Sequence, residues 1–197
     1  SEQRAALVHA FFAERQCVQI DDLPKDTPVR NIERVGVIGG GTMGVGIALS
    51  FVSAGIAVLL LEVDEPALQR ALQRARETCE ASVTRGSLSP AVMEQRLALL
   101  HGGVDYSELA TADLVIEAVF ESLEVTRQVF ERLDLVCKPG AILASNTSSL
   151  DLDAIAGFTS RPQDVVGLHF FSPANVMRLL EVVRGRPTAL DVLATVM

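Results

Sequence analysis

Apolar residues along the chain fall into short runs that alternate with segments of helical period. The runs predict strands at 34–38, 57–61, 113–117, 141–145, 165–168 and 179–183. Helical spacing predicts a helix that begins at Thr42, a long helix over 65–85, a third after Ser89-Pro90 and a fourth over 123–136. Strands that alternate with helices indicate right-handed crossovers, and therefore an α/β domain with a mostly parallel sheet.

The first 30 residues follow a different pattern. Residues 2–15 predict a short helix with one narrow apolar stripe, made of Leu7, Val8, Phe11 and Phe12. Two prolines and mixed charges then indicate a linker. We expect the stripe to dock onto a neighbouring domain. The predicted division is a linker helix and linker over 1–30 and a single domain over 31–197. The missing initiator Met favours a piece of a longer protein.

Composition and charge exclude several classes. Hydrophobic residues make up 49% of the chain and aromatic residues only 5%, which suits an Ala/Val/Leu-rich α/β core better than a β-sandwich. A net charge of −8 without a basic block argues against nucleic acid as a partner, and the apolar runs are too short to span a membrane. Cys17, Cys79 and Cys137 lack metal-ligand spacing, so we expect reduced thiols, a reducing compartment and no metal site.

A glycine-rich loop follows the first predicted strand, in the segment VGVIGGGTMGVGIA. Gly39, Gly41 and Gly44 have the G-x-G-x-x-G spacing, and a helix begins at Thr42. Gly39 permits a tight turn, Gly41 lets the backbone approach a pyrophosphate, and Gly44 lets the helix pack close to the strand. The order of strand, loop and helix predicts a Rossmann-type, doubly wound sheet that binds a dinucleotide.

An acidic residue ends the second predicted strand. Glu62 comes about 20 residues after the loop, where an acid accepts hydrogen bonds from an adenosine ribose. A solvated residue at a strand end is the simpler alternative. Because a carboxylate repels a 2′-phosphate, the acid favours NAD over NADP.

Polar residues also collect where the later strands end. They occupy 117–121, then 145–149, then His169. Ligands of a doubly wound sheet lie outside the carboxyl ends of its strands, so this succession indicates one site. Taken alone, the 145–149 cluster also fits a helix N-cap.

His169 and Glu181 are the two residues of 168–183 with proton chemistry near neutral pH, and both adjoin apolar runs. Taken singly, the first fits a hydrogen-bonded core histidine and the second an exposed edge residue. The chain turns back into 179–183, which would bring Glu181 beside His169. A carboxylate there fixes the imidazole tautomer and stabilises the imidazolium. The pair therefore predicts a general base and its orienting residue. The base takes a hydroxyl proton while hydride passes from the substrate carbon to a nicotinamide.

Four segments occur in order: GVIGGGTMGVGIA, ADLVIEAVFESLEV, ASNTSSL and GLHFFSPANVMRLLEVV. Over 32–197 the chain resembles the NAD-binding domain of the 3-hydroxyacyl-CoA dehydrogenases. FFAERQ and the linker resemble the junction of multifunctional β-oxidation enzymes, in which an enoyl-CoA hydratase half comes first. The resemblance implies NAD-dependent oxidation of an L-3-hydroxyacyl-CoA to the 3-ketoacyl-CoA, in the bacterial cytoplasm or a eukaryotic peroxisome.

The resemblance also implies roles for individual residues. His169 becomes the catalytic base, Glu181 its partner, and Ser148 lies beside the substrate hydroxyl and the nicotinamide. Family members often carry Lys where this chain has Thr126, so a cofactor or CoA contact by that Lys does not carry over. The cofactor is assigned to Gly39, Gly41, Thr42, Met43, Gly44, Glu62, Val119, Phe120, Glu121 and Asn146.

Family members continue into a helical domain that supplies an active-site Asn and most dimer contacts, whereas this chain ends at Met197. Two interpretations stay open: part of a dehydrogenase, with upstream hydratase and downstream helical domains as partners, or a dinucleotide-binding module without chemistry. The His169 motif favours the first. It argues against a related hydroxyacid dehydrogenase, which usually has a Lys base in a later helix. We expect the chain alone to turn over little substrate and to self-associate.

Overall fold

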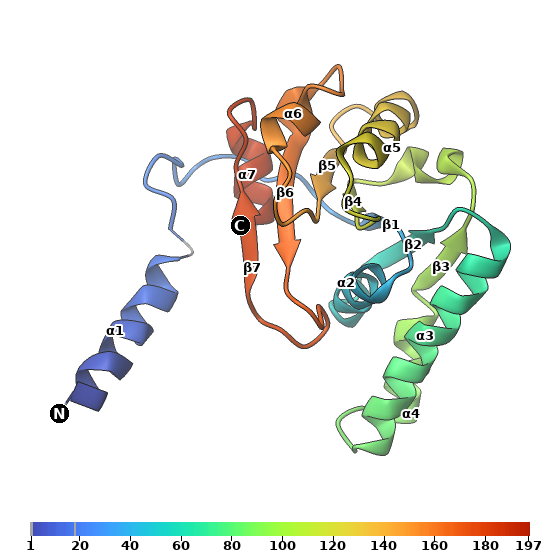
Figure 1. Cartoon of the computed structure of the whole chain (residues 1–197). Helices are drawn as coiled ribbons and strands as arrows, with labels where there is room; N and C mark the ends of the chain where they lie inside the picture. The colour runs from blue at the N-terminus through green and yellow to red at the C-terminus, as the bar shows by residue number, and fades with distance from the viewer. Residues whose placement is uncertain (1, 18) are drawn as a thin grey trace.

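The computed structural model describes residues 2–17 and 19–197, and within them seven strands form one sheet (Figure 1). The strands are β1 (Arg34–Ile38), β2 (Ala57–Leu61), β3 (Leu100–Gly103), β4 (Leu114–Glu117), β5 (Ile142–Ser145), β6 (Val165–Phe170) and β7 (Leu180–Val183). Their order across the sheet is β3-β2-β1-β4-β5-β6-β7, and all neighbours are parallel except the antiparallel pair β6–β7. The prediction of a doubly wound, mostly parallel α/β sheet is confirmed.

The described helices are α1 (Glu2–Gln16), α2 (Thr42–Ser53), α3 (Glu65–Thr84), α4 (Pro90–Leu97), α5 (Leu123–Val136), α6 (Leu152–Ala156) and α7 (Leu190–Val196), with short 3₁₀ turns η1 (Tyr106–Thr111) and η2 (Pro162–Asp164). The helices after α1 cover both faces of the sheet. Local chemistry sets the ends of α3: the Asp64 side chain accepts a hydrogen bond from the Ala67 N–H, and Gly86 follows with a φ of +73°. None of the described helices has the length and hydropathy that a membrane span needs.

Because both faces are covered, the central strands are almost continuously apolar. On β4, Leu114 and Ile116 face the layer beneath α2, α3 and α7, while Val115 faces the layer beneath α5, α6 and η1. The first layer includes Val35, Val37, Ile47, Leu60 and Val192; the second includes Phe130, Leu133, Leu143 and Ile155. Because β1 to β6 run parallel, their carboxyl ends lie together at one edge of the sheet.

One strand was missing from the sequence prediction. β3 reads LHGG, which has one apolar residue and no alternation, and it sits at the sheet edge beside β2. Its glycines serve packing, because a Cβ on Gly102 would lie 2.7 Å from the Leu68 Cδ1 atom of α3. β3 therefore forms because of its position at the sheet edge and its close packing against α3, and not because of its hydropathy.

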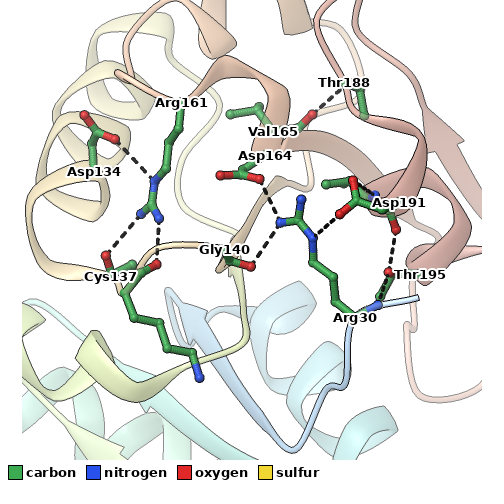
Figure 2. A network of polar contacts seen from close by, with 12 residues as sticks. Arg30, Asp134, Cys137, Gly140, Arg161, Asp164, Val165, Thr188, Asp191 and Thr195 are labelled. Carbon is green, nitrogen blue, oxygen red and sulfur yellow. Dashed lines mark hydrogen bonds and ion pairs between the residues drawn. The ribbon is translucent and has the colours of Figure 1, made fainter. Parts of the chain in front are cut away.

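The end of the linker is fixed to the sheet domain by Arg30 (Figure 2). Its guanidinium donates to Asp164 at 2.7 Å, to Asp191 at 2.9 Å and to the Gly140 carbonyl at 3.0 Å. Its backbone N–H donates to the Thr195 hydroxyl at 2.8 Å. These contacts join the linker to η2, to α7 and to the turn before β5.

The first helix stands apart from the sheet domain (Figure 1). No residue of α1 is buried, and Leu7, Val8, Phe11 and Phe12 remain exposed. The apolar stripe of the predicted linker helix is thus present on the surface, and the expectation that it docks onto a neighbouring domain stays a prediction.

Candidate cofactor and active site

The glycine loop between β1 and α2 has the backbone geometry that its spacing predicted. Gly39 has a φ of +96°, and a Cβ there would lie 2.7 Å from the Ala118 carbonyl oxygen. A Cβ on Gly44 would overlap the Gly39 carbonyl oxygen, so the helix packs closer to the strand than any side chain permits. Gly41, which precedes α2, faces open space instead. The loop therefore packs tightly against the protein at Gly39 and Gly44, and leaves space for a ligand at Gly41.

A cavity of about 540 Å³ adjoins this loop. Gly39, Gly41, Glu62, Val119 and Phe120 are among the predicted cofactor residues that line it, together with Tyr106 and Arg132. The N-terminus of α2 supplies backbone N–H groups and a positive dipole end, which suit a pyrophosphate. The bare glycine backbone and the neighbouring acid, Glu62, fit the adenosine and pyrophosphate part of a dinucleotide.

Glu62 is held in place by the backbone. One carboxylate oxygen accepts a hydrogen bond from the Gly40 N–H at 2.6 Å, and the other accepts from its neighbour Val63 at 3.0 Å. The alternative of a freely solvated residue at a strand end does not describe this carboxylate. Its position in the first cavity suits acceptance of ribose hydroxyl hydrogens.

A second cavity, of about 430 Å³, shares Ala118 and Val119 with the first. Predicted site residues that line it are Met43, Val119, Glu121, Asn146, Ser148 and His169. Of the remaining predicted residues, which all lie in the described part of the chain, Thr42, Gly44 and Glu181 line neither cavity. The two cavities are neighbours along the carboxyl edge of β2, β1, β4, β5 and β6.

Glu121 organises the turn after β5. Its carboxylate accepts hydrogen bonds from the Thr147 hydroxyl at 2.8 Å, from Ser148 N–H at 3.0 Å and hydroxyl at 3.1 Å, and from Ser149. These donors, the Thr147 hydroxyl foremost, lower the pKa of Glu121 to about 2. The helix-cap alternative for 145–149 is wrong, because Asp151 caps α6. Glu121 instead holds Ser148 at the cavity.

His169 and Glu181 meet across the antiparallel pair β6–β7. Their Cα atoms are register partners, and the distance from His169 Nδ1 to Glu181 Oε2 is 2.8 Å. A carboxylate beside Nδ1 favours the tautomer with the proton on Nδ1, which leaves Nε2 as the hydrogen-bond acceptor. Asn146 lies beside them, since its side-chain oxygen accepts from the Phe170 N–H at 2.9 Å. The geometric expectation for this pair is therefore met.

Residues 34–197 match the family model described as "3-hydroxyacyl-CoA dehydrogenase, NAD binding domain". The chain belongs to this family. The family prediction made from the four sequence segments is confirmed, and with it NAD as the cofactor class.

Among curated relatives, a peroxisomal fatty acid beta-oxidation multifunctional protein of Oryza sativa is 43% identical over 188 residues, which are 93% of this chain and 26% of the relative. The peroxisomal bifunctional enzyme of Homo sapiens is 42% identical over 201 residues, covering all of this chain and 28% of the relative. The chain thus spans about a quarter of the length of the curated relatives it matches.

Solved structures of dehydrogenases are also similar to this chain. The 3-hydroxybutyryl-CoA dehydrogenase of Escherichia coli has a TM-score of 0.81 at 45% identity, over 84% of this chain and 35% of that one. The dehydrogenase part of multifunctional enzyme 1 from C. elegans also has a TM-score of 0.81, at 33% identity over 90% of this chain and 41% of that one.

Some residues of this NAD-binding domain were not given a role by sequence reasoning. Glu117 is buried and accepts a hydrogen bond from the Ser145 hydroxyl at 2.6 Å, and burial raises its pKa. Thr126, at the position where the family often has Lys, is buried with no hydrogen-bond partner for its hydroxyl among the described residues. Arg132 lies over the Tyr106 ring at 5.2 Å in the first cavity. The sequence placed Glu117 and Ser145 in two polar clusters but did not show that they pair, because they lie 28 positions apart, and nothing in the sequence indicates the contact of Arg132 with Tyr106.

Proposed function

We propose that this chain is the cofactor-binding and catalytic-base part of an NAD-dependent L-3-hydroxyacyl-CoA dehydrogenase, which forms the 3-ketoacyl-CoA in fatty-acid β-oxidation. The observation that carries the proposal is the His169–Glu181 pair, because His169 lines the second cavity of an NAD-binding domain and Glu181 holds its imidazole there. A module that only binds a dinucleotide has no use for an oriented base there.

The first cavity holds the adenosine half of NAD in this proposal. Glu62 accepts the ribose hydroxyls and disfavours a 2′-phosphate by its charge, which supports NAD over NADP. Gly39, Gly41, Thr42 and Gly44 present bare backbone and the α2 N-terminus to the pyrophosphate. The remaining cofactor contacts come from residues that line one or both cavities: Met43, Val119, Phe120, Glu121 and Asn146.

When bound, NAD supplies the hydride acceptor. The chain itself moves the proton: His169 Nε2 takes it from the substrate hydroxyl, and Glu181 stabilises the imidazolium that results. The Ser148 hydroxyl, held by Glu121, lies in the same cavity as His169 and orients the substrate oxygen. Base, orienting acid and positioning hydroxyl thus come from three strand ends.

Further domains are part of the proposal. Residues 1–30 serve as a linker from an upstream hydratase domain, which is supported by the exposed apolar stripe of α1 and by the span of about a quarter of the multifunctional relatives. A downstream helical domain supplies the active-site Asn, the second wall of the cleft and contacts for a homo-oligomer. The three free cysteines suit a reducing compartment, the bacterial cytoplasm or a peroxisome.

The test uses the full-length protein that contains this chain. The protein is mixed with NAD and a 3-hydroxyacyl-CoA, and formation of NADH is followed by its absorbance. We expect NADH formation that His169→Gln removes while NADH binding persists. Full NADH binding without oxidation of any 3-hydroxyacyl-CoA would favour the alternative, a dinucleotide-binding module without chemistry.

A further inference from the structure

Arg74 reaches the glycine loop from α3, although it belongs to no recognised cofactor motif. Its Nη1 donates a hydrogen bond to the Gly40 carbonyl oxygen at 2.8 Å. One turn earlier, Ala71 packs so closely against the loop that a Cβ on Gly40 would overlap its methyl group. Helix α3 therefore contacts Gly40 at two points.

The other polar group of Gly40 is held as well. Its N–H donates to Glu62 at 2.6 Å, so Gly40 is bound through its N–H to the ribose-side acid and through its carbonyl to Arg74. The loop is fixed between the end of β2 and the body of α3.

Planarity of the peptide group carries this restraint to the next residue. The Gly40 carbonyl and the Gly41 N–H belong to one trans peptide and point in opposite directions. With the carbonyl directed at Arg74, the Gly41 N–H is directed away from α3. Gly41 lines the first cavity and faces open space, and its N–H has no acceptor within residues 2–17 and 19–197.

Such a restraint matters at this position because Gly39, Gly40 and Gly41 follow one another. Without Cβ atoms, the Gly40–Gly41 peptide can rotate at low steric cost. In the rotated form the Gly40 carbonyl would point into the cavity and repel phosphate oxygens. A guanidinium that holds this carbonyl disfavours the rotated form.

We infer that Arg74 is a positioning residue of the NAD site: it fixes the Gly40–Gly41 peptide so that the Gly41 N–H faces the pyrophosphate. The inference rests on the cofactor placement given in the proposed function. It assigns to α3 a part in phosphate binding that acts through the backbone and not through contact with the cofactor.

Titration of the chain with NADH, followed by fluorescence, tests this with Arg74→Met. The matched control is Arg70→Met, which removes the same charge one turn earlier on α3 at an exposed residue with no hydrogen bond or ion pair in the described chain. We expect about tenfold weaker NADH binding for Arg74→Met, the scale of a charged hydrogen bond. Arg70→Met should stay near the wild-type affinity. Unfolding temperatures near that of the wild type would show that both variants are folded.

Two further measurements separate the explanations. Arg74→Lys keeps a charged donor and should recover most of the affinity. ADP-ribose, which has the pyrophosphate but no nicotinamide, should lose as much affinity as NADH in Arg74→Met. If Arg70→Met and Arg74→Met lose the same NADH affinity, the effect comes from the net charge of α3 and not from the contact with Gly40, and the inference is overturned. Unchanged NADH binding in Arg74→Met, failure of Arg74→Lys to recover, or unchanged ADP-ribose binding would also overturn it. A wild-type chain that does not bind NADH would contradict the proposed function instead.

Discussion

His169 Nδ1 lies 2.8 Å from Glu181 Oε2, and the two residues are direct partners in the antiparallel register of β6 and β7. The side chain of His169 is 20% exposed and that of Glu181 55% exposed. The histidine is therefore sheltered at the cavity while its carboxylate partner stays in contact with solvent. The pair is built by backbone pairing, so its spacing does not depend on a flexible loop.

The first prediction concerns this pair in the full-length enzyme. His169→Gln removes the base and is expected to lower the rate at saturating substrate by about 10²–10⁴-fold, with NADH binding nearly intact. Glu181→Gln should cost a large part of the same factor, because the imidazolium loses its counter-charge. Steady-state rates and NADH titration check both. A near-normal rate in either variant would make the base assignment wrong.

The second prediction concerns cofactor choice. Glu62→Gln keeps the shape of the side chain but removes the charge that opposes a 2′-phosphate. We expect the ratio of the NADPH and NADH dissociation constants to fall by roughly tenfold, equivalent to about 1.4 kcal/mol. Glu77→Gln, an exposed change of equal charge on α3, is the control. If both variants keep the wild-type ratio, Glu62 does not select the cofactor.

The third prediction concerns pH. The folded pKa of Glu121 is lowered to about 2 from an ordinary 4.5, so its stabilising contribution is complete above about pH 5 and is lost as pH falls toward 2. Glu121→Gln should therefore unfold at a lower temperature than the wild type at pH 6, and the difference should shrink between pH 5 and pH 2. Glu14→Gln, on the exposed helix α1, should show no such convergence. A difference that does not change with pH would contradict the role of the Glu121 charge.

The fourth prediction concerns stability. Arg30→Met leaves Asp164, whose side chain is only 8% exposed, without its cation, and a loss of about 1–3 kcal/mol is expected. Arg186→Met is the matched control, because the Arg186 side chain is 94% exposed and pairs with Asp153 at 3.2 Å. It should change the unfolding free energy by less than about 0.5 kcal/mol. Chemical denaturation of the two variants measures the contrast, and equal losses would show that the Arg30 contacts add nothing specific.

The sequence by itself determined the features that depend on local order. Apolar runs located six of the strands. Most of these are covered on both faces and are therefore apolar almost throughout, whereas β7, at the sheet edge, is only partly buried. The glycine spacing located the loop, since a turn with φ of +96° at Gly39 and a close helix at Gly44 exclude side chains. Even the approach of Glu181 to His169 followed from a short return of the chain into an antiparallel partner.

Tertiary structure decided what depends on distant residues. β3 exists because β2 offers an edge, and its glycines admit α3. Arg30 meets Asp191, 161 positions away, and Arg74 on α3 meets Gly40 in the loop before α2. Glu121 binds the 147–149 turn only because β4 and β5 end side by side. A hydrogen bond between remote side chains leaves no periodicity in the chain, so only the packed sheet brings these partners together.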